Sequence, residues 1–269
     1  MQIIDGKKIK EEIIARLKNQ PRPGKRLAAI LFGNDRLSEI FIKEKEKAAK
    51  ELGVDFKIYQ FDEKLSNDQA RDEISKIALQ KPVGGVIVQL PLPEYLNGRY
   101  VLNVIPREKD VDVLGERALG AFYANRNLVL PPPAGAVEEI LNSKSYILNS
   151  KNVAVVGLGF LIGRPIGLWL IGKAQEIYLL ASQSDLGILK HADLVISGVG
   201  KAGLIKPDML KNGAGIIDFG YEEVNGKAKG DFDANTPGVD KMSFYTSTPG
   251  GTGPIVVAKI FENFYKLNT

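Results

Sequence analysis

The chain has 269 residues and a formal net charge of +4, and 44% of its residues are hydrophobic and 25% charged. This composition is typical of a globular protein with enough chain for one large domain or two of ordinary size. The small positive balance includes no Lys/Arg block, which argues against nucleic acid as a partner. Cysteine is absent and His191 is the single histidine, so disulfides are excluded and neither a Ser-His-Asp triad nor a metal site is expected.

The N-terminal segment predicts an amphipathic helix over residues 7–19, because its isoleucines and Leu17 recur at helical spacing. Its charges are spread along the segment, so no secretory signal peptide is expected. Apolar stretches such as residues 85–92 are far shorter than the roughly twenty residues that a membrane helix needs. We therefore expect a cytoplasmic protein without a membrane partner.

Strands and helices alternate through the first half of the chain. Apolar or alternating runs predict strands at residues 26–32, 55–61 and 84–90, and helical patterns lie between them at 38–52 and 67–79. This order predicts parallel βαβ units in which helices cover a sheet. The alternation stops between about residues 107 and 130, and the prolines at 131–133 suit the entry to a linking helix at 136–141.

A second alternating series follows this linker. Its predicted strands are residues 153–157, 176–181, 193–198 and 215–220, and a last helix is predicted at 254–267. The sequence therefore predicts an α/β protein with two lobes. An N-terminal α/β substrate lobe spans residues 1–130, a Rossmann-like dinucleotide-binding lobe with a parallel sheet spans 131–253, and a C-terminal helix, 254–269, returns to the first lobe.

A glycine-rich turn follows the first strand of the second lobe. Residues 157–163 read Gly-Leu-Gly-Phe-Leu-Ile-Gly, and Arg164, Pro165 and an apolar helix come next. The pattern is one residue longer than the usual dinucleotide fingerprint, yet it meets the same needs: a tight turn, close approach of the backbone to pyrophosphate, and N–H groups at a helix start. An ordinary strand-to-helix turn is the alternative. The position inside a βαβ unit favours a cofactor site.

The end of the next strand bears on which nicotinamide cofactor binds. An NAD site usually places Asp or Glu there to accept hydrogen bonds from the ribose hydroxyls. This chain has Ser182 and Gln183 instead, with Arg164 and Lys173 as nearby cations in sequence. Without the acid, a 2′-phosphate meets no repulsive charge, so NADP is favoured over NAD.

Several residues of the first lobe stand at positions suited to a binding or catalytic site. Phe41 and Lys45 are four residues apart and share a helix face. Gln89 ends an apolar strand, and Asp110 and Asp112 lie in the irregular stretch that follows. Each has a plainer interpretation. Lys45 belongs to a run of Lys and Glu typical of a solvated face, and the other residues could cap a strand or a turn.

Together these segments resemble the bifunctional methylenetetrahydrofolate dehydrogenase/methenyltetrahydrofolate cyclohydrolase family. That family has Ser-x-x-Tyr-x-x-x-Lys, Val-Gln-Leu-Pro-Leu-Pro, Lys-Asp-Val-Asp-Gly and Gly-Arg-Ser-x-x-Val-Gly-Lys-Pro segments, followed by Gly-Asp-Val-Asp and Thr-Pro-Val-Pro-Gly-Gly-Val-Gly-Pro. The similar segments lie here, in the same order, at residues 38–45, 88–93, 109–112, 157–165, 230–233 and 246–254.

The resemblance implies an enzyme of one-carbon metabolism, which supplies purine biosynthesis. Such an enzyme oxidises 5,10-methylenetetrahydrofolate to the methenyl form with NADP and hydrolyses the product to 10-formyltetrahydrofolate. The first lobe would be the folate-binding catalytic domain and the second the NADP-binding domain. The family's habit also implies a homodimer through the cofactor lobe.

The resemblance assigns catalytic roles to Lys45, Gln89 and Asp112. Aspartate suits a pterin because its two oxygens accept together from the 2-amino group and the ring N3–H. The implied substrate-binding residues are Phe41, Gln89, Leu90, Pro91, Asp112, Pro249, Gly250 and Gly251. The implied cofactor-binding residues are Gly157, Leu158, Gly159, Gly163, Arg164, Pro165, Ser182 and Gln183.

Several positions depart from the family pattern. Phe41 replaces the tyrosine and keeps an apolar ring for stacking but no hydroxyl, which predicts altered hydrolysis. Leu158 replaces the arginine of the cofactor turn, and Val113 replaces the glycine after the second aspartate. The family's Cys-Thr before the linker helix is replaced within residues 130–133.

The chemistry expected of such an enzyme divides into two steps. Hydride transfer needs little acid–base help, so positioning and electrostatics should dominate. Hydrolysis needs water to attack and a proton to reach a ring nitrogen, and Lys45 with Gln89 is the expected group for that work.

Three alternatives fit part of the pattern. Another two-lobed Rossmann oxidoreductase, such as one resembling shikimate dehydrogenase, would leave residues 88–93 and 249–254 unexplained. A non-catalytic folate- or nucleotide-binding relative would suit Phe41 and Leu158. A dehydrogenase with impaired cyclohydrolase activity is the third.

Overall fold

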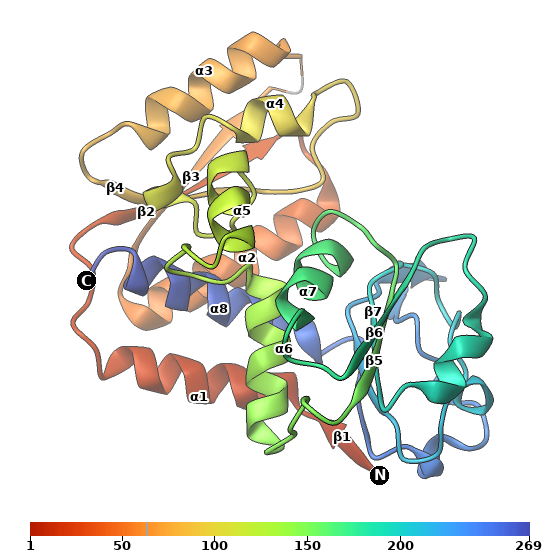
Figure 1. Cartoon of the computed structure of the whole chain (residues 1–269). Helices are drawn as coiled ribbons and strands as arrows, with labels where there is room; N and C mark the ends of the chain where they lie inside the picture. The colour runs from red at the N-terminus through yellow and green to blue at the C-terminus, as the bar shows by residue number, and fades with distance from the viewer. Residues whose placement is uncertain (63) are drawn as a thin grey trace. The chain divides into compact units, whose positions relative to one another are not determined.

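The computed structural model describes residues 1–62 and 64–269. The chain divides into two compact units (Figure 1). One, the three-stranded unit, comprises residues 12–132 and 257–269, and the other, the six-stranded unit, comprises residues 1–11 and 133–256. Each unit is named for its main sheet and is described by itself.

The three-stranded unit is built from the first predicted βαβ series. Its strands are β2 (Arg26–Phe32), β3 (Asp55–Phe61) and β4 (Val83–Val88), all parallel in the order β3-β2-β4. The connecting helices are α2 (Arg36–Leu52) and α3 (Asn67–Ala78). The expected strands and helices are confirmed, and buried apolar residues fill the central strand.

Capping residues explain where these helices begin and end. The Asp35 carboxylate accepts from the Ser38 backbone N–H at the start of α2, and Gly53, in the left-handed region, ends it. Ser66 and Gln69 form a capping box at the start of α3. Each cap satisfies backbone groups that the helix itself leaves unpaired.

The stretch that follows β4 is less irregular than its sequence indicates. It contains α4 (Gly98–Leu102), a 3₁₀ turn η1 (Arg107–Lys109) and α5 (Glu116–Tyr123). These elements are too short to show a clear apolar period. The turn between η1 and α5 carries Asp110 and Asp112, and an isolated bridge joins Asp110 to Val86 of β4.

The six-stranded unit holds the second series and its sheet is wholly parallel. The strand order is β1-β11-β8-β7-β5-β6, formed by β1 (Gln2–Ile4), β11 (Phe244–Thr246), β8 (Gly215–Asp218), β7 (Leu194–Ser197), β5 (Asn152–Val156) and β6 (Glu176–Leu180). The remaining elements are α6 (Pro132–Ser143), α7 (Gly163–Leu170), η2 (Leu186–His191), η3 (Pro207–Met209), η4 (Val239–Lys241) and the antiparallel pair β9 (Glu222–Val224) and β10 (Lys227–Lys229). The strands predicted at 153–157, 176–181, 193–198 and 215–220 are confirmed.

The first eleven residues belong to the six-stranded unit, whereas the expected boundary placed them in the first lobe. Strand β1 pairs in parallel with β11, and the Gly6 N–H donates to the Gly250 carbonyl at 3.1 Å. Backbone packs so closely here that a Cβ on Gly6 would lie 1.6 Å from the Gly251 oxygen. A three-residue strand has no readable period, and its partner lies at the far end of the chain.

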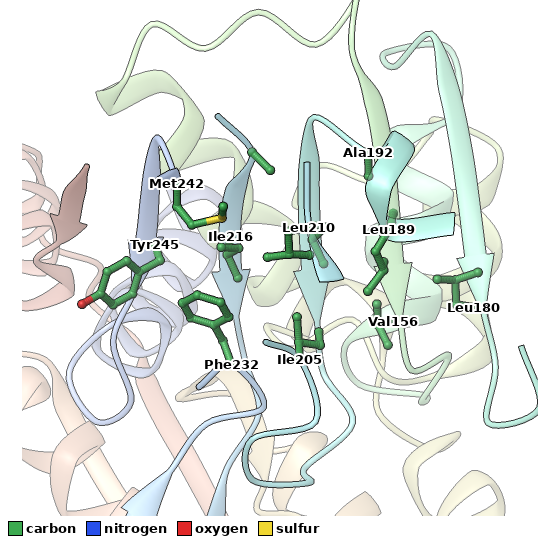
Figure 2. Close-up of a cluster of buried hydrophobic side chains, with 13 residues drawn as sticks. Val156, Leu180, Leu189, Ala192, Ile205, Leu210, Ile216, Phe232, Met242 and Tyr245 are labelled. Carbon is green, nitrogen blue, oxygen red and sulfur yellow. The ribbon is translucent and has the colours of Figure 1, made fainter. Parts of the chain in front are cut away.

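One cluster of buried apolar side chains in the six-stranded unit lies on one face of its sheet (Figure 2). Phe232 and Tyr245 stack at a tilt with ring centroids 5.5 Å apart, beside Met242 and Ile216. Further along the sheet the cluster continues through Ala154, Val156, Leu180, Leu189, Ala192, Val195, Ile205, Leu210 and Ala214. Burial of this apolar surface holds the strand ends, and the loops that follow them, in place.

The C-terminal helix α8 (Thr252–Lys266) runs from the six-stranded unit into the three-stranded unit, as the expected return to the first lobe. Phe264 packs against β4, where a Cβ on Gly85 would lie 2.7 Å from the phenyl ring. The Asn268 amide closes the contact by donating to the Gly84 carbonyl at 3.0 Å. Within the described residues, no helix has the length and apolar character that crossing a membrane requires.

Candidate active site

Lys45 and Gln89 meet inside the three-stranded unit. Lys45 lies on α2 and is only 8% exposed, and its Nζ donates to Gln89 Oε1 at 2.7 Å. Gln89 follows β4, and its own Nε2 donates to the Leu90 carbonyl at 2.7 Å, which fixes which end of the amide faces the lysine. The structure therefore contradicts the plainer interpretation of Lys45 as part of a solvated face.

Burial and a carboxylate act in opposite directions on Lys45. Burial lowers the pKa of the Lys45 ammonium, and the negative charge of Asp112 raises it in part. Burial likewise raises the pKa of Asp112, and Lys45 opposes that shift. Both shifts favour the neutral forms of the two side chains, as is typical of ionisable groups in functional sites.

The turn that carries Asp112 is held by its neighbour Asp110. The buried Asp110 carboxylate accepts from the backbone N–H groups of Leu114, at 3.0 Å, and Gly115, at 2.7 Å. Burial raises the pKa of Asp110 to about 7, against the lowering effect of those N–H groups. Val113 adopts a φ of 57°, where the similar family segment has glycine, so the turn keeps its left-handed shape with a β-branched residue.

Asn263 of α8 also holds the turn that carries Asp112, through hydrogen bonds to the backbone. Its buried Nδ2 donates to the carbonyls of Val111 and Leu130, each at 2.8 Å. Val111 stands between the two aspartates, and Leu130 immediately precedes the triple proline. Asn263 was not predicted from sequence as part of this site, because a lone asparagine in an apolar helix does not reveal which distant carbonyls it contacts.

The remaining expected substrate residues of this unit lie near the same side chains in the fold. Phe41 is one turn before Lys45 on α2 and is 39% exposed. Leu90 follows Gln89, and a cis peptide bond joins Leu90 to the exposed Pro91. The buried Ser38 hydroxyl, on the first turn of α2, has no hydrogen-bond partner among the described residues. The unit therefore combines an apolar ring, a buried amine and a carboxylate.

The glycine turn of the six-stranded unit has the shape that a pyrophosphate needs. Gly157 has a φ of 85°, and a Cβ on Gly163 would lie 1.8 Å from the Gly157 oxygen, so the turn closes tightly on itself. A Cβ on Gly159 would meet nothing within 4 Å, which leaves open space beside the backbone. Helix α7 starts at Gly163 without a side-chain cap. The Arg164 N–H donates to the Gly159 carbonyl at 3.1 Å and Pro165 has no N–H, so the Gly163 N–H is the donor of this helix start that suits an anion.

The other residues expected to bind the cofactor lie next to this turn or at the end of β6. Arg164 is exposed and its Nε donates to the Leu158 carbonyl at 3.0 Å, across the mouth of the turn. Pro165 is buried on the first turn of α7. Ser182 and Gln183 are exposed just beyond the carboxyl end of β6, next to β5 in the sheet. An α/β sheet binds its dinucleotide at this edge.

The segment with Pro249, Gly250 and Gly251 lies in the six-stranded unit rather than with Lys45. It follows β11 after a cis bond before Pro249, and Gly250 has a φ of 96°. A Cβ on Gly251 would lie 2.4 Å from the Ser247 oxygen. Glycine is therefore required there by close backbone packing.

Two buried carboxylates of the six-stranded unit were not predicted as part of a site. Asp218 ends β8, and Asp231 belongs to the segment 230–233 singled out by the family resemblance. Burial raises the pKa of Asp218 to about 7; the Phe232 backbone N–H opposes this shift and the charge of Asp231 adds to it. The type of residue was visible in the sequence, whereas its burial was not.

These features define a class of protein, a two-unit α/β enzyme with a glycine turn suited to a dinucleotide in one unit and a buried lysine and glutamine near Asp112 in the other. Models of two known protein domains match most of the chain, one in each half. Residues 4–112 match the catalytic domain of tetrahydrofolate dehydrogenase/cyclohydrolase, and residues 131–269 match its NAD(P)-binding domain. The chain belongs to the tetrahydrofolate dehydrogenase/cyclohydrolase family.

Individual relatives agree over nearly the full length. The bifunctional protein FolD of Staphylococcus aureus is 32% identical over 97% of this chain and 94% of its own. The crystal structure of the Campylobacter jejuni bifunctional FolD is 28% identical, covers 100% of this chain and 98% of its own, and has a TM-score of 0.95. The Trypanosoma brucei FolD structure, complexed with NADP and an inhibitor, is 25% identical, with coverage of 98% and 96% and a TM-score of 0.91.

Membership of this family decides among the alternatives left by the sequence. The chain is an oxidoreductase and hydrolase of tetrahydrofolate one-carbon metabolism, with a folate-binding catalytic domain and an NAD(P)-binding domain. The interpretation as another two-lobed oxidoreductase is therefore wrong, and the enzyme interpretation is supported over a non-catalytic binding protein.

Proposed function

We propose that the chain oxidises 5,10-methylenetetrahydrofolate to the methenyl form with NADP and hydrolyses that product to 10-formyltetrahydrofolate. Lys45, Gln89 and Asp112 of the three-stranded unit would act on the folate. The turn at residues 157–165, with Ser182 and Gln183, would hold the cofactor. The observation that carries the proposal is the buried Lys45–Gln89 hydrogen bond beside Asp112, because a solvated lysine would not serve as a proton carrier near neutral pH.

The folate side of the proposal follows from the chemistry of these side chains. Asp112 accepts from the pterin 2-amino group and N3–H, and Phe41 supplies an apolar surface against an aromatic ring. Gln89, fixed by its bond to the Leu90 carbonyl, holds the Lys45 amine in one position. Positioning of this kind is what hydride loss from the one-carbon bridge chiefly requires.

Hydrolysis makes the larger demand on Lys45. The neutral amine takes one proton as water attacks the methenyl carbon, and the resulting ammonium returns that proton to a ring nitrogen as the C–N bond breaks. The hydroxyl left on the one-carbon unit gives up its own proton to solvent as the formyl C=O forms. Burial already favours the neutral amine. Asp112 stabilises the ammonium that forms between the two events.

The proposed cofactor-binding residues of the six-stranded unit suit NADP. Bound NADP would accept the hydride from the one-carbon bridge. The open space beside Gly159 and the uncapped start of α7 suit the pyrophosphate, and Pro249, Gly250 and Gly251 would contact bound substrate. Ser182 and Gln183 offer hydrogen bonds without a negative charge, and exposed Arg164 offers a cation, so a 2′-phosphate is preferred over a free hydroxyl.

A paired absorbance assay tests this function. Purified protein is mixed with methylenetetrahydrofolate and either NADP or NAD, and reduced cofactor is followed at its own wavelength and methenyltetrahydrofolate at another. We expect turnover with NADP well above that with NAD, and separate loss of added methenyltetrahydrofolate. No reduced cofactor with either nucleotide would contradict the proposal.

A second candidate function is a dehydrogenase with reduced cyclohydrolase activity. Phe41 favours it, because the ring one turn from Lys45 carries no hydroxyl that could join the proton path. The ratio of the two rates in the assay above separates the candidates. We further propose, by analogy with the family, that the enzyme works in the cytoplasm. By the same analogy it forms a homodimer through the six-stranded unit, and sedimentation of the purified protein would test whether it is a dimer.

A further inference from the structure

The segment Gly230-Asp231-Phe232-Asp233 contains a buried carboxylate with an unusual set of partners. Asp231 is fully buried, and its Oδ2 accepts from the Ser197 hydroxyl at 2.6 Å and from the Val199 N–H at 2.7 Å. Its Oδ1 accepts from the Lys201 N–H at 2.7 Å. One carboxylate therefore satisfies three donors from the end of β7 and the loop that follows it.

That loop needs such an anchor because of its composition. It reads Gly198-Val199-Gly200-Lys201, and Gly200 has a φ of 78°. Two glycines in four residues leave the free loop many conformations, so its order must come from contacts made elsewhere. The side chains of Val199 and Lys201 are exposed, and the backbone bonds to Asp231 lie beneath them.

Asp218 extends the anchor to the neighbouring strands. Its carboxylate accepts from the N–H groups of Gly220, at 2.7 Å, and Phe232, at 2.9 Å. Its backbone carbonyl accepts from the Thr252 hydroxyl at the start of α8, at 2.9 Å. The pair of aspartates thus ties together the loops after β7, β8 and β11.

These loops stand beside the glycine turn. Strands β8, β7 and β5 are neighbours in the parallel sheet, so the loops that follow them share its carboxyl edge. A Cβ on Gly198 would lie 2.5 Å from Ile162 of the turn, and a Cβ on Gly157 would lie 3.0 Å from the Gly198 oxygen. A shift of residues 198–201 would therefore press directly on the backbone proposed to hold the pyrophosphate.

We infer that Asp231 is a positioning residue for the dinucleotide: it holds residues 198–201 against the glycine turn and so completes the cofactor-binding edge. The inference rests on the proposed function, since it takes the turn as the NADP site. Asp231 acts through the loop backbone and is assigned no contact with substrate or cofactor. It adds a role for residues 230–233 beyond the folate and cofactor contacts described above.

The test compares Asp231→Asn with Asp233→Asn from the same segment. The Asn amide keeps one acceptor oxygen and turns an N–H₂ toward the loop donors. By contrast, within residues 1–62 and 64–269 the Asp233 carboxylate accepts from local partners, the Asn235 N–H and the Thr236 hydroxyl. Titration calorimetry with NADP should show the Kd of Asp231→Asn rising by about tenfold or more, while that of Asp233→Asn stays within about twofold. Calorimetry measures binding directly and needs no turnover.

Cyclohydrolase activity provides an internal control, because hydrolysis uses no nucleotide and its proposed catalytic residues, Lys45, Gln89 and Asp112, lie in the three-stranded unit. It should stay within about twofold in Asp231→Asn. Ser197→Ala, which removes the hydroxyl donor and leaves both backbone donors, should weaken NADP binding by about threefold to tenfold and decides the question if Asp231→Asn does not fold.

Several results would overturn the inference. An NADP Kd equal to that of the unaltered protein in Ser197→Ala and Asp231→Asn would show that the anchor does not shape the site. An equal loss of NADP binding and cyclohydrolase activity would assign Asp231 a general structural role instead. Failure of the unaltered protein to bind NADP would instead overturn the proposed function, and the inference with it.

Discussion

Lys45 Nζ lies 2.7 Å from Gln89 Oε1, and this hydrogen bond joins the middle of α2 to the end of β4. The two residues are far apart in sequence, and both are buried. The bond supplies the amine with a polar partner in place of water, and the nearby charge of Asp112 opposes the effect of burial. The bond therefore supports the proposed role of Lys45 as a proton carrier in hydrolysis.

The first prediction concerns Lys45→Met. Removing the amine should lower cyclohydrolase activity by about 10²- to 10⁴-fold, the usual contribution of a general acid–base group, and dehydrogenase activity far less. Initial rates of methenyltetrahydrofolate loss and of NADPH formation measure the two. Lys43→Met, on the exposed face of the same helix, is the control and should change neither rate. Retention of both activities in Lys45→Met would show that another group moves the proton.

The pH profile of the unaltered enzyme follows from the same residue. Because hydrolysis begins with the neutral amine, its rate should rise with pH through a midpoint below the ordinary lysine pKa of 10.5, as burial lowers that pKa. The midpoint should be absent from the Lys45→Met profile. A rate that falls as pH rises over this range would assign Lys45 the role of acid in the first step.

Asp112→Asn should affect folate and leave NADP binding unchanged. An amide oxygen can accept one of the two pterin N–H donors, so the KM for methylenetetrahydrofolate should rise by about 10- to 100-fold. Loss of the negative charge also removes the effect that raises the Lys45 pKa, so the cyclohydrolase midpoint should move to lower pH. Glu108→Gln, an exposed carboxylate near the same turn, is the control. An unchanged folate KM would remove Asp112 from the substrate site.

Phe41→Tyr tests the effect of having phenylalanine on α2 where the similar family segment has tyrosine. A hydroxyl one turn before Lys45 adds a donor beside the proton path, and one such hydrogen bond is worth about 0.5–1.5 kcal/mol. The ratio of cyclohydrolase to dehydrogenase rate should therefore rise by about two- to tenfold. Ile40→Tyr adds the same group at the adjacent exposed position and should leave the ratio unchanged. If the ratio also stays constant in Phe41→Tyr, the missing hydroxyl has no bearing on hydrolysis.

Asn263→Leu tests the link between α8 and the Asp112 turn. It leaves the Val111 and Leu130 carbonyls buried without their donor, so the free energy of unfolding should fall by about 2–4 kcal/mol and the folate KM should rise. Asn268→Leu is a matched control, because Asn268, just beyond the end of the same helix, also donates to two carbonyls, that of Gly84 on β4 and that of Phe264 on α8. Urea unfolding and folate kinetics measure both. A folate KM raised equally by the two variants would mean that Asn263 has no special bearing on Asp112.

The sequence alone determined the features whose signals are local. The two alternating series of strands and helices were predicted because apolar spacing within each short window sets which face of an element is buried. The glycine turn was predicted for the same reason: Gly157, Gly159 and Gly163 are read together within a single strand-to-helix connection. The ordered family segments predicted Lys45, Gln89 and Asp112 as site residues.

Only the tertiary structure decided the features whose partners are distant in the chain. Pairing of β1 with β11 moved the first eleven residues to the six-stranded unit, against the expected boundary. Asn263 and Asp231 are ordinary polar residues in sequence, and they gain their meaning from burial against carbonyls and N–H groups of remote loops. A buried polar group must find partners, and folding alone determines which ones come within reach.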